Sequence, residues 1–325
     1  MEQKQYVPTW REPSADADPP IDPAALRRLR GRYQGSIFGL ACGDAMGATT
    51  QFRKAGHFAP VTGLGGGGQW QLPPGAWTDD TAMSLCLAES LLAIEVLDPA
   101  DQRRRYRNWQ QQGHLTSTGE CLGITAGVAA SLGREHPADG GCGSEAVTRA
   151  GVVALFAASH PQRALAWAAA AAAATDGSAA VRNAAIVYAT LMLAALGGGR
   201  RDALVARARA LWREHAAAPV GIFDVALGGG AWRVPLTGGA PADPFAVLRL
   251  VVAALLGSEG FRDGLLAIVN GGGDADLHGA LFGQLAGAVY GLEAIPPAWQ
   301  AAILGRARLQ EVADRLLAAA LAPRD

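Results

Sequence analysis

Lysine is almost missing from this 325-residue chain: Lys4 and Lys54 are the only two, and arginine supplies the rest of the basic side chains. No Gly-x-x-x-x-Gly-Lys phosphate loop is present, which excludes P-loop chemistry, and a Schiff-base mechanism has almost no candidate amine. With 28 basic and 29 acidic residues the net charge is −1, so the chain lacks the positive charge that non-specific nucleic-acid binding requires. We therefore expect no nucleic-acid partner.

Paired cysteines, a secretory leader and long apolar runs are missing as well. The four cysteines stand far apart without a C-x-x-C spacing, and the N-terminus carries charges and prolines rather than an apolar stretch. The longest uninterrupted apolar run, residues 164–174, has 11 residues, whereas a membrane-spanning helix needs about 20. These absences predict reduced thiols, a cytoplasmic location and no membrane segment.

Alternating runs of Val, Ile and Thr are almost absent, so a sheet has little material from which to form. Alanine and leucine instead recur at spacings of three and four residues, which is typical of helices. Residues 1–23 contain five prolines and scattered charges and are predicted to be a tail. Residues 24–322 are predicted to form one compact all-α domain. Helices are expected over residues 24–47, 78–95, 100–112, 121–132, 146–158, 161–174, 179–195, 201–215, 245–256, 261–269, 276–291 and 307–321.

The first acidic motif is Thr78-Asp79-Asp80, which follows a loop rich in glycine and proline and precedes a helical pattern. Thr78 stands where a helix N-cap belongs, and acidic residues in a first turn are favoured by the helix dipole, so a capped helix explains part of the motif. Two adjacent carboxylates flanked by hydroxyls are also the oxygen ligands that hard divalent cations bind.

The second acidic motif, Asp274 and Asp276, follows the run Asn270 to Gly273 and leads into another helical pattern. Residues two apart on a helix point about 200° apart, so these carboxylates converge only where the loop enters the helix. An EF-hand is excluded because the twelfth loop position is Leu285 rather than Glu.

Both motifs stand at glycine-rich helix starts, and neither has a lysine partner nearby. Four carboxylates brought together repel one another unless a cation neutralises them. The sequence has no Cys/His ligand spacing for zinc, so Mg²⁺ or Mn²⁺ fits the oxygen donors better. We expect the two motifs to meet around a cation.

The chain resembles the ADP-ribosylglycohydrolase family over about residues 31–291. The resemblance rests on four stretches: GSIFGLACGDAMGATTQF (35–52), PGAWTDDTAMSLCLAESLL (74–92), STGECLGITAGVAASL (117–132) and NGGGDADLHGALFGQLAGAVYG (270–291). It implies an orthogonal helical bundle with a two-metal site. It also implies hydrolysis of the glycosidic bond that joins ADP-ribose to a protein side chain or a small acceptor.

The resemblance also assigns roles to individual residues. It implies that the metal ligands are Thr78, Asp79, Asp80, Asp274 and Asp276, and that Asp80 and Asp274 are the candidate catalytic carboxylates. Glycine-rich loops would present backbone N–H groups to the diphosphate, which makes Gly143, Ser144, Glu145, Gly272 and Gly273 the candidate substrate contacts.

Five positions depart from the family pattern. Leu277 replaces a hydroxyl ligand, so one or two cations remain possible, and Gly123 replaces an acidic residue. Glu145 follows Gly143-Ser144 where Gly-Asn-Gly is usual, Asp176 replaces a histidine, and Gln51 replaces a glutamate. His278 is either an ordinary helix-face histidine or a replacement ligand.

These departures leave three functional hypotheses. The first is a metal-dependent hydrolase of ADP-ribosyl N- or O-glycosidic bonds, and the second is a catalytically impaired protein that still binds ADP-ribose. The third is a hydrolase with another substrate, in which Glu145 reshapes the diphosphate end of the pocket. For the first two hypotheses the expected partner is ADP-ribose or an ADP-ribosylated acceptor; the acceptor, the metal and the oligomeric state stay open.

Overall fold

The structure is a computed structural model, and it describes residues 22–135, 137, 143–236 and 243–322. Most of the predicted tail, residues 1–23, lies outside the described residues, but its last two residues belong to the first helix. Asp22 caps this helix, because its carboxylate accepts hydrogen bonds from the N–H groups of Ala24 (3.0 Å) and Ala25 (3.1 Å). Pro23 follows at the first helical position, where its fixed φ suits the turn.

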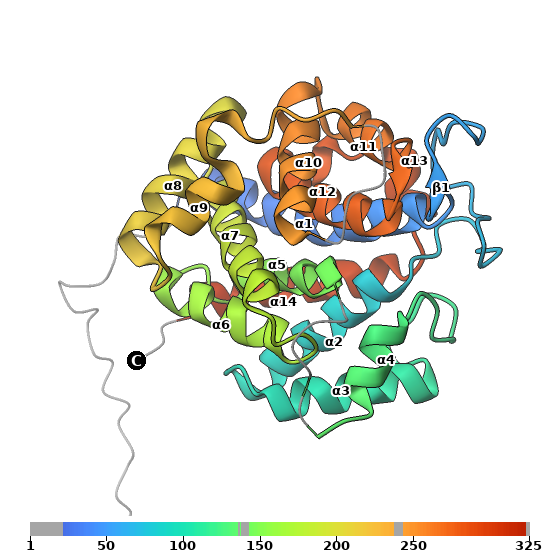
Figure 1. Cartoon of the computed structure of the whole chain (residues 1–325), viewed down its shortest axis with the longest axis horizontal. Helices are drawn as coiled ribbons and strands as arrows, with labels where there is room; N and C mark the ends of the chain where they lie inside the picture. The colour runs from blue at the N-terminus through green and yellow to red at the C-terminus, as the bar shows by residue number, and fades with distance from the viewer. Residues whose placement is uncertain (1–21, 136, 138–142, 237–242, 323–325) are drawn as a thin grey trace, which may run out of the picture.

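The prediction of an all-α fold is confirmed, and Figure 1 shows the arrangement of the helices. The described α-helices are α1 (Pro23–Gly47), α2 (Asp79–Ile94), α3 (Pro99–Gln112), α4 (Ala126–Leu132), α5 (Thr148–Phe156), α6 (Pro161–Ala173), α7 (Ala179–Leu196), α8 (Leu204–His215), α9 (Val220–Leu227), α10 (Pro244–Gly257), α11 (Phe261–Val269), α12 (Ala275–Tyr290), α13 (Pro297–Ala302) and α14 (Arg306–Leu321). Short 3₁₀ helices are η1 (Gly143–Val147), η2 (Arg201–Ala203), η3 (Gly228–Gly230) and η4 (Leu292–Ala294). Strands β1 (Arg53–Lys54) and β2 (Gly272–Gly273) pair in antiparallel fashion.

Three predicted helices begin at least two residues later than the sequence pattern indicated; one of them, expected over residues 201–215, begins at Leu204 after η2. The helix expected over residues 121–132 begins at Ala126, because Gly123 adopts φ +90°, which no right-handed helix contains. The helix expected from residue 146 begins at Thr148 and is preceded by η1. Helices α9 and α13 were not expected; both are short, with eight and six residues, so their periodicity is weak.

Helices α1 and α12 touch through their backbones (Figure 1). A Cβ atom built on Gly35, Gly39 or Gly43 would lie 2.4, 2.0 or 1.8 Å from a carbonyl oxygen of α12, namely that of Gly287, Gly283 or Gly279 respectively. These glycines recur every four residues on both helices, so they form one stripe on each helix. Only glycine allows such a close approach of two backbones.

Helix α7 runs through the core, and α5, α6, α8, α10 and α12 pack against it. It is the one described helix that is long and apolar enough to cross a membrane, but most of it is buried inside the fold. A buried core helix of a globular protein has the same composition. Helix α7 therefore does not contradict the prediction of no membrane segment.

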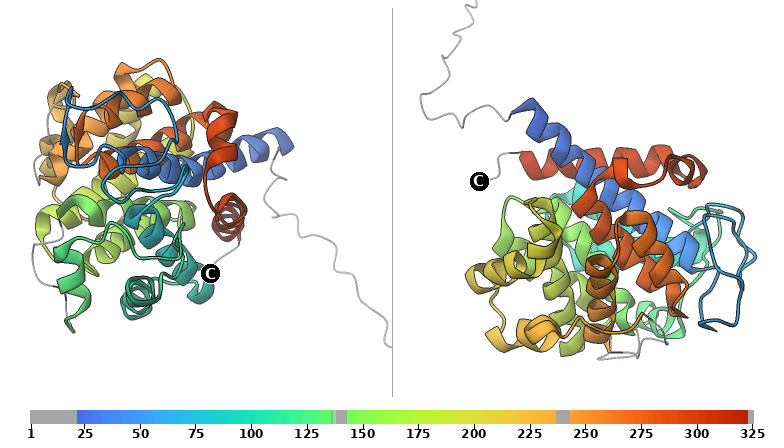
Figure 2. Two further views of the ribbon diagram at one scale, coloured as in Figure 1. Left: turned by 90° about the vertical axis from the view of Figure 1, so that its right-hand side faces the viewer. Right: turned by 90° about the horizontal axis from the view of Figure 1, so that it is seen from above.

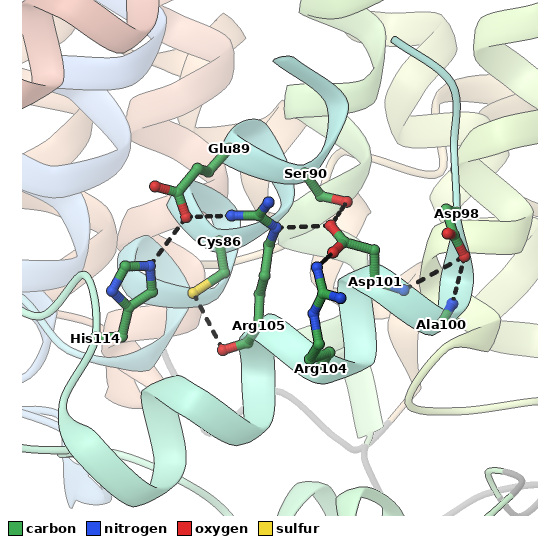
Figure 3. Close-up of polar contacts among 9 residues, drawn as sticks. All are labelled: Cys86, Glu89, Ser90, Asp98, Ala100, Asp101, Arg104, Arg105 and His114. Atoms are coloured by element: carbon green, nitrogen blue, oxygen red, sulfur yellow. Dashed lines mark hydrogen bonds and ion pairs between the residues drawn. The ribbon is translucent and has the colours of Figure 1, made fainter. Parts of the chain in front are cut away.

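Helices α2 and α3 are joined by a network of charged side chains, which Figure 3 shows. Arg105 of α3 contacts both Asp101 (2.6 Å) and Glu89, and the Glu89 carboxylate also lies 2.9 Å from Nε2 of His114. The Ser90 hydroxyl donates to Asp101 at 2.6 Å. This network holds α3 against α2, the helix that begins with the first acidic motif.

Candidate active site

The N-terminus of α2 is held by a carboxylate from another helix rather than by its own cap. Thr78 is the N-cap residue, but its side chain makes no capping hydrogen bond. Its backbone N–H (2.9 Å) and hydroxyl (2.6 Å) both donate to one oxygen of Asp44. The backbone N–H (2.9 Å) and hydroxyl (2.6 Å) of Thr81 donate to the other oxygen. Simple capping by Thr78 is therefore wrong as an explanation of this motif.

Asp44 is the site residue that the sequence reasoning missed. It is fully buried in α1, and its four hydrogen bonds place Thr78 and Thr81 on either side of the first acidic motif. The available signal was a single carboxylate among the small and apolar residues of residues 35–47. A lone acid on such a helix is costly to bury without partners.

The structure brings the two acidic motifs together. Burial raises the pKa of Asp79 to about 7, and the charges of Asp44 and Asp274 add to this shift. Burial also raises the pKa of Asp80 well above its usual value, with further contributions from Asp79 and Asp44. Burial likewise raises the pKa of Asp276, from the other motif, well above its usual value, and the charges of Asp274 and Asp80 raise it further. Such mutual effects require the carboxylates to lie close to one another.

The stripe of glycines explains this convergence. Gly43 meets Gly279, and Gly47 meets Ala275 at the start of α12, where a Cβ on Gly47 would lie 2.1 Å from the Ala275 carbonyl oxygen. Asp44 follows Gly43 directly, and Asp276 follows Ala275 directly. The backbone contact thus brings the carboxylates of both helices to the N-terminus of α2.

The donor set suits a hard divalent cation. Among the described residues no three His, Cys, Asp or Glu side chains are already arranged around a single metal position. However, Asp80, which is 3% exposed, has a buried carboxylate oxygen, Oδ1, with no hydrogen-bond partner within the described part of the chain. A buried carboxylate oxygen without a donor is costly, and a cation held by carboxylate and hydroxyl oxygens satisfies it.

Glu145 lies with the acidic cluster. It belongs to η1, its carboxylate accepts a hydrogen bond from the Thr125 hydroxyl at 3.1 Å, and burial raises its pKa to about 8, with further contributions from Asp79 and Asp274. Gly143 is the first residue of η1, and the hydroxyl of Ser144 is buried without a partner in the described region. The predicted substrate segment therefore stands beside the carboxylates.

Gly272 and Gly273 form β2, directly before Asp274. Both have positive φ, +68° and +70°, and they pair with Lys54 and Arg53 of β1. The carbonyl oxygen of Gly273 accepts a hydrogen bond from the backbone of Phe52 at 2.6 Å. This pairing holds the turn that carries Asp274; the diphosphate contact of the two glycines stays a prediction.

The structure explains two of the departures from the family pattern. At Gly123 a Cβ atom would lie 2.1 Å from Oδ1 of Asp79, and the backbone has φ +90°. An acidic side chain therefore does not fit at this position in the observed backbone. Leu277 is 2% exposed and packs into the main hydrophobic core, so it offers no oxygen to the site.

Two further departures, Asp176 and Gln51, and the neighbouring candidate His278 have separate surroundings. His278 is fully buried, and neither ring nitrogen has a hydrogen-bond partner among the residues described; burial lowers its pKa to about 4. It is thus neither solvated nor on an open helix face. Asp176 accepts a hydrogen bond from the Ser178 backbone at 2.8 Å, and Gln51 accepts one from Gln69 at 2.7 Å.

The chain belongs to the ADP-ribosylglycohydrolase family, which matches residues 25–325. It is 31% identical over 273 residues to the ADP-ribosyl-[dinitrogen reductase] glycohydrolase of Rhodospirillum rubrum, covering 82% of this chain and 88% of that protein. It is 29% identical over 296 residues to the ADP-ribosylarginine hydrolase Tri1 of Serratia proteamaculans (strain 568), covering 88% of this chain and 78% of that protein. A solved structure, an ADP-ribosylglycohydrolase-related protein complex, is 34% identical with a TM-score of 0.77 and covers 91% of this chain and 100% of that one.

Proposed function

We propose that this protein hydrolyses the N-glycosidic bond between ADP-ribose and an arginine side chain, with Mg²⁺ or Mn²⁺ as cofactor. The observation that carries the proposal is the convergence of Asp79, Asp80, Asp274 and Asp276, together with a buried oxygen of Asp80 that finds no donor among the described residues. The name of one of the relatives, the ADP-ribosylarginine hydrolase Tri1 of Serratia proteamaculans, supports arginine as the acceptor in preference to other side chains.

The cation would be held by Thr78, Asp79, Asp80, Asp274 and Asp276, and it would supply Lewis-acid polarisation of the ribose hydroxyls and of the attacking water. Leu277 removes one oxygen from this set, so we propose one tightly held cation rather than two.

The protein's own residues supply orientation and a proton acceptor. Asp44 fixes the first turn of α2 through four hydrogen bonds, so Asp79 and Asp80 start from a defined backbone. Water attacks the anomeric carbon; the new C–O bond forms as the C–N bond to the guanidine breaks. One proton of the water passes to the Asp80 carboxylate, with Asp274 as the second candidate, and from there to the departing guanidine nitrogen, so that the arginine side chain leaves as guanidinium.

A cavity of about 600 Å³ beside β1 is our candidate for the part of the substrate away from the scissile bond. Thr49, Thr50 and Arg53 line one side of it, and residues 59–66 and 68 contribute the rest. Arg53 is the only charged residue in this lining, which suits a diphosphate. Arg53→Gln is expected to raise KM at least fivefold with little change in kcat, whereas Lys54→Gln, at the next position and outside the lining, is expected to leave both unchanged.

The central test is a hydrolysis assay on an ADP-ribosylated arginine peptide with Mg²⁺ or Mn²⁺, combined with calorimetric binding of ADP-ribose. We expect turnover that Asp80→Asn lowers at least 100-fold, because the proton acceptor and a cation ligand are lost together. Asp263→Asn is the matched control, since this aspartate is exposed at the start of α11.

The same assay separates the alternative, a protein that binds ADP-ribose without turnover. The positions of Gly123 and Leu277 favour this alternative, because neither supplies the oxygen that the family pattern has there. Binding of ADP-ribose without hydrolysis under either metal would replace the proposed activity with the binding function. Hydrolysis that Asp80→Asn does not affect would refute the proposed site.

A further inference from the structure

A second cavity, of about 410 Å³, lies between the N-terminal half of α1 and the C-terminal end of α12. Arg27, Arg28 and Arg32 line one side, and Tyr290 and Leu292 line the other. We call it the arginine groove. The first turns of α1 extend beyond the neighbouring helices in both views of Figure 2.

The arginine groove is separate from the acidic site. Arg28 and Asp44 lie on the same helix, 16 residues apart, and a rise of 1.5 Å per residue places them about 24 Å from each other along α1. None of the residues that line the groove belongs to the acidic cluster.

Three arginines line the groove, against one acidic residue, Glu293. Burial lowers the pKa of Arg32, and the nearby charges of Arg207 and Arg28 lower it further. Arg32 donates to two backbone carbonyls at the C-terminal end of α7, those of Ala195 (2.7 Å) and Leu196 (3.3 Å), and among the described residues it donates to no carboxylate. Arginines that lower one another's pKa repel one another, and a bound anion relieves this repulsion.

The other side chains around the groove add one more guanidinium group and an aromatic ring but few carboxylates. Arg201 donates to the Tyr290 hydroxyl at 3.0 Å, which places a fourth guanidinium next to the aromatic wall. Glu293 is the one acid in the lining, and Asp22 reaches Arg28 only at 3.8 Å with both side chains more than 60% exposed. Such an exposed pair contributes little.

We propose that the arginine groove binds a small ligand with two adjacent phosphates and an apolar ring, that is, a nucleoside diphosphate. Guanidinium groups form paired hydrogen bonds with phosphate oxygens, while Tyr290 and Leu292 offer a surface for the base. A cavity of this volume falls in the range of small-molecule sites, about 300–1,000 Å³. An acidic protein segment is the less favoured occupant, because the arginines line a hollow rather than a flat face.

The test is calorimetry with ADP, inorganic pyrophosphate and adenosine on the full chain without ADP-ribose, because the diphosphate and adenine of ADP-ribose would also enter the groove; binding at the acidic site is recognised by its insensitivity to the loss of Arg27 and Arg28. We expect ADP to bind more tightly than pyrophosphate, and adenosine weakly. Hydrogen exchange with ADP should slow at residues 24–32 and 289–293.

The diagnostic variant is Arg27→Gln/Arg28→Gln, because both side chains are exposed and their loss spares the fold. It should weaken ADP binding at least tenfold. Arg306→Gln/Arg308→Gln removes the same charge from exposed positions on α14 and should change the affinity less than twofold. Equal loss in both variants, equal affinity for sulfate, or tighter binding of a poly-glutamate peptide than of ADP would each overturn the proposal.

Discussion

Replacing Gly39 with alanine adds one methyl group at the point where α1 meets α12. The new Cβ would lie 2.0 Å from the carbonyl oxygen of Gly283 and 2.7 Å from its carbonyl carbon. Both are backbone atoms, so no side-chain rotation relieves the contact. The two helices must move apart by about 1 Å before the contact reaches a tolerable length, in an interior packed as closely as a crystal.

The magnitude follows from two opposing terms. Alanine is favoured over glycine inside a helix by about 1 kcal/mol. Overpacking a close-packed contact costs about 1–3 kcal/mol, and a backbone contact belongs at the upper end. Gly39→Ala should therefore destabilise the protein by about 2 kcal/mol, which corresponds to a fall in Tm of roughly 3 °C for a chain of this length.

Gly31→Ala is the matched control on the same helix. Gly31 lies two repeats of four residues before Gly39, yet a Cβ atom there meets nothing within 4 Å. Only the propensity term remains, so this variant should be stabilised by about 0.5–1 kcal/mol. Urea unfolding followed by circular dichroism measures both. Equal stability of the two variants would mean that α1 and α12 do not meet through their backbones, and the explanation of how the acidic motifs converge would fail.

Three further outcomes are expected. Asp44→Asn presents an amide to donors that need an acceptor, so we expect about 2 kcal/mol lower stability in urea unfolding and at least tenfold lower kcat in the hydrolysis assay. Gly123→Ala and Gly119→Ala each place a side chain at φ near +90°, which should lower the stability of either variant by about 1–2 kcal/mol. Only the new methyl group at position 123 meets Asp79, so only Gly123→Ala should weaken ADP-ribose binding in calorimetry. Burial alone would raise the pKa of Asp101, but the Ser90 hydroxyl and two arginines lower it below its usual value. The stabilisation by Asp101 is therefore complete above about pH 4 and is lost as the pH falls through the folded-state pKa; Asp101→Asn should cost about 2 kcal/mol at pH 7 and little near pH 2 by urea unfolding.

Features encoded locally were the ones that the sequence predicted. The helices follow from alanine and leucine at a period of three to four residues, and the two acidic motifs stand out because their members are adjacent. Asp44 was missed because its partners, Thr78 and Thr81, are more than 30 residues away, and nothing in its own segment names them. The surroundings of Gly123 could not be predicted for a similar reason: its φ of +90° and its closeness to Asp79 exist only in the folded chain.

Because of the glycine stripe between α1 and α12, the fold and the activity of this protein depend on different residues. The glycines hold the two backbones together whatever acids follow them, so a descendant chain can lose its aspartates one at a time and keep its shape. Loss of a stripe glycine has a different effect, because a single added methyl group moves α1 and α12 apart and shifts all the carboxylates at once. Among relatives of this protein, we therefore expect a chain with intact glycines and altered acids to keep the fold and to have a lost or changed activity. A chain with altered glycines is expected to pack the two helices differently.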